Sequence, residues 1–304
     1  MTIQLQGLVA ATHTPFLKDG TVNLAAVEKQ APHLIDNGIQ AAFVCGTTGE
    51  SHSLTLEERL SLVKRWSEVV QGTKLTLIVH VGSNCLPDAC TLARHAQEMG
   101  AHAISALAPS YFKPKSLDVL VAWCSEIARA APDLPFYFYD IPALTGVSFS
   151  MPDFLETACS RIPNLRGIKF TNPDLMSYQR CLHAQDGRFD VPWGVDEYLL
   201  AALACGAVGA VGSSYNFAAP VYHRMMAAYS RGDMETARAE QFRSVRLIEA
   251  LAGFGYMAAA KAVMSFLGVD VGGPRLPHAS LTVEDRQKLR SRLEHLGFFD
   301  WIRP

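Results

Sequence analysis

Residues 165–174, LRGIKFTNPD, begin as a short apolar run and end in polar residues that favour a turn. Such a run is typical of a buried strand followed by a loop. The run nevertheless contains a lysine, Lys169, although burying an ammonium ion costs several kcal/mol unless it is paired or loses its proton. This stretch raises two questions: whether the same strand pattern recurs along the chain, and why a buried strand contains Lys169.

Eight short apolar runs recur along the chain, and helix-length segments with a 3.6-residue apolar spacing separate most of them. One such segment opens with Thr55-x-x-Glu58, the pattern of a helix capping box. Strands that alternate with helices predict a parallel sheet, and eight strand–helix units in about 220 residues are typical of a closed barrel. The runs are residues 7–12, 41–46, 75–82, 102–109, 135–142, 165–171, 189–194 and 206–212.

The main alternative fold is an open, doubly wound sheet. Such a sheet usually has fewer strands, and a nucleotide-binding version usually carries GxGxxG after the first strand, which this chain does not. From Pro220 onward the strand pattern stops, and the remaining segments have helical periodicity. We therefore predict an α/β fold with a (β/α)8 TIM barrel over residues 1–220, and a helical extension over residues 221–304 that packs on the barrel.

The composition excludes several classes of function. The chain has 304 residues, of which 49% are hydrophobic, and a net charge of -2, so nothing suggests binding to nucleic acid or to an anionic membrane. Its seven cysteines are scattered without a CxxC pair, which disfavours a zinc site or a disulfide framework. We expect reduced, mostly buried thiols in a cytoplasmic protein, and the N-terminal residues lack the pattern of a signal peptide.

Strand alternation predicts where Lys169 points. Gly167, Lys169 and Thr171 share one face of the strand, whereas Ile168 and Phe170 share the other, which suits the layer between sheet and helices. Lys169 then points into the barrel near its C-terminal mouth, where active sites of such barrels lie. Burial there favours a neutral amine, which can attack a ketone and form a Schiff base. Spacing alone does not separate this interpretation from a lysine that reaches solvent or pairs with a carboxylate.

The fifth run places a tyrosine beside that lysine. Phe136, Phe138 and Asp140 share one face, and Tyr137 and Tyr139 share the other. If the phenylalanines face the helices, both tyrosines face the barrel lumen, with Tyr139 nearer the mouth. A phenol beside a cationic imine can donate and accept a proton. For the deeper Tyr137 we favour an ordinary core aromatic with a hydrogen-bonded hydroxyl.

Three further polar features stand outside the strand pattern. The loop GTTGES at residues 46–51 offers N–H and O–H donors that can cradle a small anion, although glycine-rich turns are common after strands. Asp196 and Glu197 stand where a loop enters a helix, and their spacing alone favours helix capping over binding of substrate hydroxyls. Lys261 lies in a mostly apolar helix, which suggests a structural lysine.

Three motifs in this order resemble one superfamily. They are GTTGE at 46–50, YDIPALTGV at 139–147 and the lysine of the 165–171 strand, and they resemble the pyruvate-dependent class I aldolases that include N-acetylneuraminate lyases and dihydrodipicolinate synthases. The resemblance covers nearly the whole chain. It implies a (β/α)8 barrel, a Schiff-base lysine at Lys169, a homotetramer, and no metal or organic cofactor.

Within the superfamily the chain is most similar to the N-acetylneuraminate lyases. The similar segments are IPALTG at 141–146, GIKFTNPDL at 167–175, GVDE at 194–197 and GAVGSSYN at 209–216. Dihydrodipicolinate synthases resemble the chain less, because they typically carry an arginine in the loop after strand five that holds a second carboxylate. Here that loop reads Ala143-Leu144-Thr145, and Leu144 cannot bind a carboxylate. Asp140, in place of an expected Asn or His, and ESHSL at 50–54 depart from the lyase pattern.

The resemblance implies roles for named residues. Lys169 would be the nucleophile and Tyr139 the proton carrier, with Thr48 and Tyr111 completing the catalytic group, Tyr111 by reaching the active site of an adjacent subunit. The residues that would bind substrate are Thr47 and Thr48 at the carboxylate and Thr171, Gly194, Asp196, Glu197 and Ser213 along the sugar. The implied reaction is reversible cleavage of N-acetylneuraminate to pyruvate and N-acetylmannosamine.

Two other functions stay open from the sequence. One is another pyruvate aldolase of the same family, acting on a 2-keto-3-deoxy sugar acid or resembling dihydrodipicolinate synthase. The other is a non-catalytic barrel that binds a sugar or pyruvate as a sensor. Retention of both Lys169 and Tyr139 disfavours the sensor, because binding alone does not need an imine.

Overall fold

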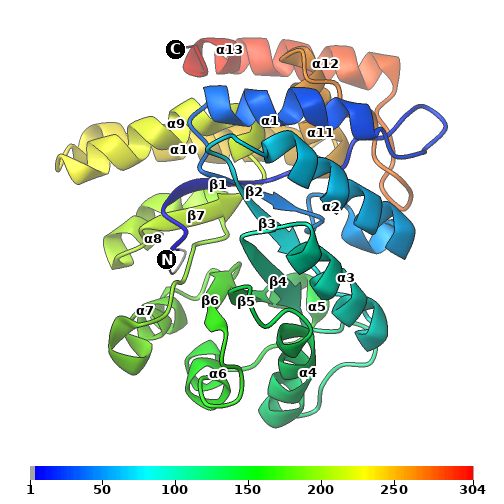
Figure 1. The fold of residues 1–304 in the computed structure, drawn as a ribbon. Helices are drawn as coiled ribbons and strands as arrows, with labels where there is room; N and C mark the ends of the chain where they lie inside the picture. The colour runs from blue at the N-terminus through cyan, green and yellow to red at the C-terminus, as the bar shows by residue number, and fades with distance from the viewer. Residues whose placement is uncertain (1–3, 304) are drawn as a thin grey trace.

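The computed structural model describes residues 4–303, and its strands form one parallel sheet that curves into a barrel (Figure 1). The order of strands in the sheet is β6-β5-β4-β3-β2-β1-β7. Each strand from β2 to β6 therefore pairs with the strand that precedes it in sequence, and β7 pairs with β1. The strands are β1 (Gly7–Ala11), β2 (Ala41–Val44), β3 (Thr76–His80), β4 (Ala103–Leu107), β5 (Phe136–Asp140), β6 (Leu165–Phe170) and β7 (Gly209–Gly212).

The eighth predicted strand, residues 189–194, closes the barrel through isolated bridges and is not a regular strand. Trp193 forms a parallel bridge with Phe170 of β6 and another with Ala210 of β7. Pro192 lies inside this segment and has no N–H to donate, which prevents a continuous ladder, although its carbonyl accepts from the Phe170 N–H at 3.0 Å. The predicted (β/α)8 TIM barrel is therefore confirmed, with one strand reduced to bridges.

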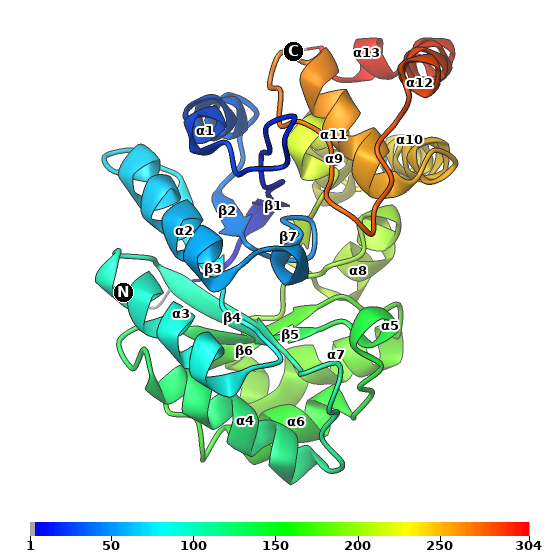
Figure 2. The ribbon, with the colours of Figure 1, turned by 90° about the vertical axis from the view of Figure 1, so that its right-hand side faces the viewer.

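Helices surround the strands, and the C-terminal helices gather on one side, next to α1, β1 and β7 (Figures 1 and 2). Around the barrel lie α1 (Val27–Asp36), α2 (Leu56–Val70), α3 (Leu86–Glu98), α4 (Leu117–Arg129), α5 (Pro142–Thr145), α6 (Met151–Ala158), α7 (Leu175–His183) and α8 (Leu199–Cys205), with 3-10 turns η1 (Leu24–Ala26), η2 (Ser51–Ser53), η3 (Ala184–Gly187) and η4 (Asp196–Tyr198). The later helices are α9 (Tyr215–Ser230), α10 (Met234–Ala252), α11 (Tyr256–Phe266), α12 (Val283–Leu296) and α13 (Phe298–Trp301).

The boundary that we predicted at residue 220 falls inside helix α9. This helix starts three residues after β7, packs against β1, and also packs along α10. It thus serves both as the last helix of the barrel and as the base of the C-terminal helices. The division at residue 220 stays a prediction, and residues 1–3 and 304 at its outer ends lie outside the described range.

The two faces of the strands separate as the alternation predicted. Phe136 and Phe138 pack in the layer between sheet and helices, where the ring of Phe138 lies 4.6 Å from that of Phe154 in α6. Tyr137 and Tyr139 belong to the separate apolar cluster inside the barrel. The predicted role of Tyr137 as a hydrogen-bonded core aromatic is borne out by its hydroxyl, which donates to Asp190 at 2.8 Å.

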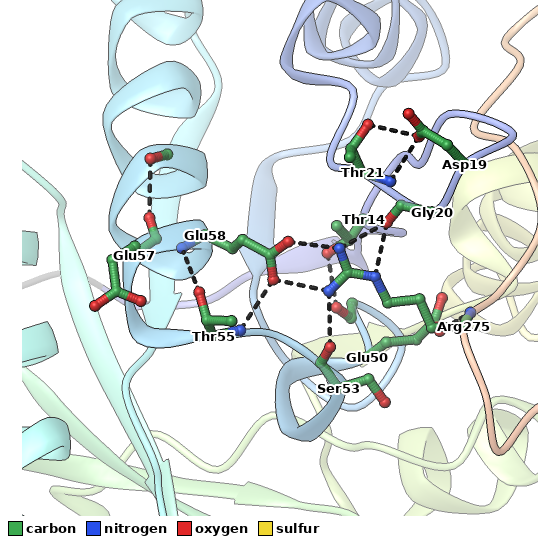
Figure 3. A network of polar contacts seen from close by, with 12 residues as sticks. Thr14, Asp19, Gly20, Thr21, Glu50, Ser53, Thr55, Glu57, Glu58 and Arg275 are labelled. Atoms are coloured by element: carbon green, nitrogen blue, oxygen red, sulfur yellow. Dashed lines mark hydrogen bonds and ion pairs between the residues drawn. The ribbon is translucent and has the colours of Figure 1, made fainter.

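One arginine from the C-terminal part ties the loops at the mouth of the barrel together (Figure 3). The Arg275 guanidinium donates to the Gly20 carbonyl after β1, to the Ser53 carbonyl after β2, and to the carboxylate of Glu58 in α2. Glu58 also completes the predicted capping box, because its carboxylate accepts from the Thr55 N–H at 2.9 Å. The hydrogen bonds of Arg275 to Glu58 hold the pKa of this carboxyl below its ordinary value.

A buried ion pair strengthens the contact between the C-terminal part and the loop after β2. Lys261 of α11 lies 2.7 Å from Glu50, and neither side chain is exposed to solvent. Glu50 also accepts from the Arg275 backbone N–H at 2.8 Å, and Lys261 donates to the Gly273 carbonyl at 3.0 Å. Burial lowers the pKa of Lys261 to about 8, and the Glu50 carboxylate opposes that shift. The interpretation of Lys261 as a structural lysine is therefore confirmed.

Two remaining expectations concern cysteines and membranes. Only Cys45, Cys124 and Cys181 are buried, so the prediction of mostly buried thiols is wrong. Cys90, Cys159 and Cys205 are partly exposed, and Cys85 is exposed. All seven are free thiols.

Among residues 4–303 no single helix has the length and apolar composition of a membrane span. Only α10 and α11 taken together, which are strongly bent relative to each other, have that length and composition.

The buried pair predicts a large effect of Lys261→Met on stability. Removing the ammonium leaves the Glu50 carboxylate buried and unpaired, so we expect a loss of about 3–5 kcal/mol in the free energy of unfolding measured with urea. The double variant Glu50→Gln/Lys261→Met should recover part of this loss, because neither charge is then left alone. As a control, Lys288→Met breaks an exposed pair with Glu284 and should cost less than about 0.5 kcal/mol. Equal stability of the two single lysine variants would contradict this account.

Candidate active site

A cavity of about 320 Å³ opens at the C-terminal ends of the strands, where barrels of this kind place their reactive groups. Its floor and walls combine residues from the barrel loops with residues from α10 and α11. The lining residues are Ala11, Thr47, Thr48, Tyr139, Lys169, Thr171, Gly194, Val195, Asp196, Glu197, Val211, Gly212, Ser213, Ile248, Tyr256 and Met257. All predicted substrate-binding residues lie in this set, and of the predicted catalytic residues only Tyr111 does not.

Lys169 is buried inside this cavity without a carboxylate partner. The residue is 4% exposed, and none of the ion pairs among residues 4–303 includes it. Its Nζ donates to Thr171 Oγ1 at 3.4 Å and lies 3.5 Å from the centre of the Tyr139 ring. An aromatic face and one hydroxyl solvate an amine much less than water does. Of the two sequence-based alternatives, a lysine that reaches solvent or pairs with a carboxylate is thereby excluded.

Tyr139 presents its ring to the lysine and its hydroxyl to the loop after β2. The hydroxyl lies 3.3 Å from Thr47 Oγ1, and either group can be the donor. Edge contacts with the rings of Phe43 and His80 hold the tyrosine ring in place. A phenol in this position connects the space above the amine to a second hydroxyl, as a proton carrier requires.

Hydrogen bonds to backbone carbonyls hold the loop of Thr47 and Thr48 on both sides. Glu50 N–H donates to the Thr47 carbonyl at 2.9 Å, and Thr14 Oγ1 donates to the Gly49 carbonyl at 2.6 Å. Glu50 itself adopts the left-handed conformation, with φ of 53°, which is costly for a residue with a side chain. The buried pair between Glu50 and Lys261 stabilises that strained position and thereby fixes the two threonines.

Asp196 occupies the opposite wall, and the helix-cap interpretation that spacing alone favoured is wrong. Its carboxylate makes no capping bond to η4. Instead Oδ2 accepts from both the N–H and the hydroxyl of Ser214. Burial raises the pKa of Asp196 to about 6, while the hydrogen bonds from Ser214 and the charge of Lys169 oppose that rise. Tertiary contacts across the barrel therefore outweigh the local preference for capping.

Two glycines make room for this wall. A Cβ at Gly212 would lie 1.9 Å from Asp196 Oδ1, so only glycine lets the carboxylate lie across β7. A Cβ at Gly194 would lie 2.0 Å from Thr171 Oγ1, the hydroxyl that contacts the amine of Lys169. Glu197 and Ser213 complete the polar end of the cavity.

Among the lining residues that sequence reasoning missed, Ile248, Tyr256 and Met257 come from α10 and α11. The hydroxyl of Tyr256 lies 2.8 Å from Ser213 Oγ, and burial raises the pKa of this phenol. A tyrosine next to the glycine that caps α11 was visible in the sequence, but nothing local shows that this helix end reaches the barrel mouth.

Tyr111 lies outside the cavity. It is 78% exposed and forms an edge contact with the ring of Phe112, which is 85% exposed. Two large aromatic side chains thus stand in solvent on the loop after β4. No contact among residues 4–303 brings Tyr111 to its own Lys169, so its predicted role depends on another subunit.

Asp140 faces the helices, behind the reactive face of β5. It is 3% exposed, and Asn172 Nδ2 donates to its carboxylate at 3.4 Å. Burial raises the pKa of Asp140 to about 7, and the single long hydrogen bond from Asn172 opposes this only weakly. The departure noted in the sequence thus adds a titrating group next to the site without placing it in the cavity.

Comparison with known proteins agrees with this geometry. The model of the dihydrodipicolinate synthetase family matches residues 4–296. The chain is 40% identical to N-acetylneuraminate lyase A of Xenopus laevis, over 95% of this chain and 96% of that protein. The structure of Proteus mirabilis N-acetylneuraminate lyase superposes with a TM-score of 0.95 and 41% identity. The match covers 97% of this chain and 100% of that one.

A dihydrodipicolinate synthase of Bacillus anthracis is also similar, with a TM-score of 0.89 and 32% identity over 96% of this chain and 98% of that one. The chain therefore belongs to the dihydrodipicolinate synthetase family of barrel enzymes. Within that family it is more similar in sequence to these N-acetylneuraminate lyases than to this dihydrodipicolinate synthase.

Asp140 predicts a pH-dependent difference in stability. Because its pKa is raised on folding, its contribution to stability is present below the unfolded value near 3.8 and is lost as the pH rises through about 7. Asp140→Asn should therefore gain stability relative to the native chain between pH 5 and pH 8, by about 1–4 kcal/mol in urea unfolding. The exposed Asp133→Asn is the control for the same substitution on the surface. A flat difference for Asp140→Asn would disprove the titration.

Proposed function

We propose that the chain is a Schiff-base-forming aldolase that reversibly cleaves N-acetylneuraminate to pyruvate and N-acetylmannosamine. The observation that carries this proposal is the buried amine of Lys169, which has a phenol and two threonine hydroxyls on one side and acidic residues on the other. The family and the N-acetylneuraminate lyases named above support the same reaction. The reaction class is carbon–carbon bond cleavage through a lysine imine.

The proposed mechanism begins with the open-chain substrate, which presents a ketone at C2. The neutral amine of Lys169 attacks this carbon, and loss of water gives a protonated imine. The C3–C4 bond then breaks, its electron pair forms an enamine, and a proton leaves the C4 hydroxyl. Tyr139 takes or relays this proton, with Thr47 within hydrogen-bonding distance of the phenol. Protonation at C3 and hydrolysis release pyruvate and regenerate Lys169.

The two ends of the cavity suit the two ends of this substrate. Backbone amides and hydroxyls of Thr47 and Thr48 would hold the carboxylate without reorganisation. Asp196, Glu197 and Ser213, together with Gly194 and Thr171, would hold the polyol, because carboxylates accept hydrogen bonds from several hydroxyls at once. None of the described lining residues is an arginine, which disfavours a substrate with a second carboxylate.

We also propose that the chain assembles as a homotetramer in the cytoplasm. The exposed aromatic pair of Tyr111 and Phe112 supports the assembly, because burying it against a second copy would bring Tyr111 towards that copy's cavity. The seven free thiols support a reducing compartment. Light scattering of the purified chain measures the assembly directly.

Lys169→Ala should abolish both pyruvate release and imine formation. We would follow release from N-acetylneuraminate with lactate dehydrogenase, and trap the imine with borohydride and pyruvate, detecting the adduct by mass spectrometry. The exposed Lys29→Ala is the matched control and should behave as the native chain does. Trapping that persists in Lys169→Ala would show that another lysine is the nucleophile. Trapping of pyruvate at Lys169 without pyruvate release from N-acetylneuraminate would show that the substrate is another 2-keto acid.

Tyr139→Phe should separate proton transfer from imine formation. We expect kcat for cleavage to fall by about 10²–10⁴-fold, because the phenol carries the proton, while borohydride still traps pyruvate on Lys169. Tyr137→Phe removes the neighbouring inward hydroxyl, which donates to Asp190, and should lower stability with little change in kcat. Equal kcat values for the two variants would remove Tyr139 from the mechanism.

A further inference from the structure

A chain of buried hydroxyls leads from Asp196 away from the cavity and into the C-terminal helices. Ser214 Oγ bonds to Asp196 Oδ2, and it lies 2.6 Å from the hydroxyl of Tyr222 in α9. That hydroxyl lies 2.7 Å from Ser244 Oγ in α10. Ser214, Tyr222 and Ser244 are all fully buried, so water does not compete for these bonds. The proposed catalytic steps make no use of this chain.

The direction of each hydrogen bond in this row of hydroxyls follows from the number of protons that each group can donate. An ionised carboxylate only accepts, so the single proton of Ser214 points to Asp196. Ser214 must then accept from Tyr222, and Tyr222, having spent its one proton, must accept from Ser244. Burial raises the pKa of Tyr222, so the phenol keeps this proton at neutral pH. The three O–H groups thus donate in one direction along the row, which ends at Oδ2 of Asp196, and each hydrogen bond strengthens the next.

Asp196 depends on these bonds because it has few others. Among the described residues, Oδ2 accepts from Ser214 alone, through both N–H and O–H, and Oδ1 lies against Gly212 at the cavity wall. On α10, the neutral Gln241 contacts only its backbone carbonyl, at 3.5 Å. The titratable groups that act on its carboxylate are Lys169 of β6, Glu197 of η4, Tyr215 and Tyr222 of α9, and Tyr256 of α11.

We propose that Ser214, Tyr222 and Ser244 form a positioning relay that keeps Asp196 ionised and aimed into the cavity, and that this relay determines affinity for the hydroxylated end of the substrate. The part of this inference that concerns the substrate rests on the proposed function. The relay acts through Asp196 and touches no reacting atom. It gives the C-terminal helices a direct part in specificity, because Tyr222 and Ser244 lie on α9 and α10.

The chain provides a matched pair of variants for the test. Tyr222→Phe removes the middle hydroxyl of the relay. Tyr215→Phe removes a hydroxyl from the same helix that is equally buried but has no hydrogen-bond partner among the described residues. The two rings contact each other edge to face at 4.6 Å, so both variants alter the same packing layer. Only Tyr222→Phe interrupts the bonds to Asp196.

The first measurement is the pH dependence of kcat/KM for N-acetylneuraminate, which reports ionisations of the free enzyme. Losing the polarising hydroxyl should move the acidic limb for Tyr222→Phe about one pH unit higher. The deficit against the native chain should be roughly fivefold at pH 6 and within about twofold at pH 9. Tyr215→Phe should retain the native profile. The pH profile of borohydride trapping with pyruvate should be the same in all three proteins.

Two results of this measurement would overturn the relay. A uniform loss for Tyr222→Phe at every pH would show a structural role alone. A parallel shift of the trapping profile would show that the hydroxyl acts through Lys169 and not through Asp196. Ser244→Ala, at the far end of the relay, should shift the acidic limb in the same direction by a smaller amount.

A second measurement does not depend on the substrate. A raised pKa of Asp196 means that stability is lost as the pH rises through that value, so Tyr222→Phe should lose more stability than Tyr215→Phe between pH 5 and pH 8. We expect the difference in Tm between the two variants to widen by about 2–4 °C over this range. A constant difference would overturn the relay. If the native chain does not cleave N-acetylneuraminate but the difference widens, the proposed substrate fails and the relay stands.

Discussion

The structure depends on keeping one lysine inside a barrel without a counter-ion. Its amine contacts the face of the Tyr139 ring and the hydroxyl of Thr171, and no ion pair among the described residues includes it. Strand alternation points Lys169 inward, and Trp193 closes the barrel by bridging β6 and β7. An open sheet would leave the same strand face in contact with solvent or with a helix.

The two ends of the cavity are held by different means, and both reach into the C-terminal half of the chain. On the side of Thr47 and Thr48, a buried ion pair joins Glu50 to Lys261 of α11 and supports a strained backbone position. On the side of Asp196, neutral hydroxyls from α9 and α10 stabilise a buried carboxylate. The C-terminal helices are therefore part of the site: they form its wall and set its electrostatics.

Much of this arrangement follows from patterns that are visible in the chain. The alternation in strands five and six predicts the inward positions of Tyr139 and Lys169, because the period of a strand leaves only two choices. The capping box of α2 is local and was equally predictable. The prediction that Asp196 caps a helix is wrong, because Ser214 is next to it only after the barrel closes. Residues 189–194 read as a strand, yet Pro192 limits them to bridges.

The fold class and the inward positions of Lys169 and Tyr139 are predictable from the amino-acid sequence, since periodicity and short motifs are properties of contiguous residues. Tertiary contacts alone place Tyr256 and Met257 at the cavity and pair Lys261 with Glu50 across 211 residues of sequence. They also link the hydroxyls of Tyr222 and Ser244 to Asp196 through Ser214. These contacts escape sequence patterns because burial, with the pKa shifts and hydrogen bonds that it enforces, arises from segments far apart in sequence that meet only in the closed barrel.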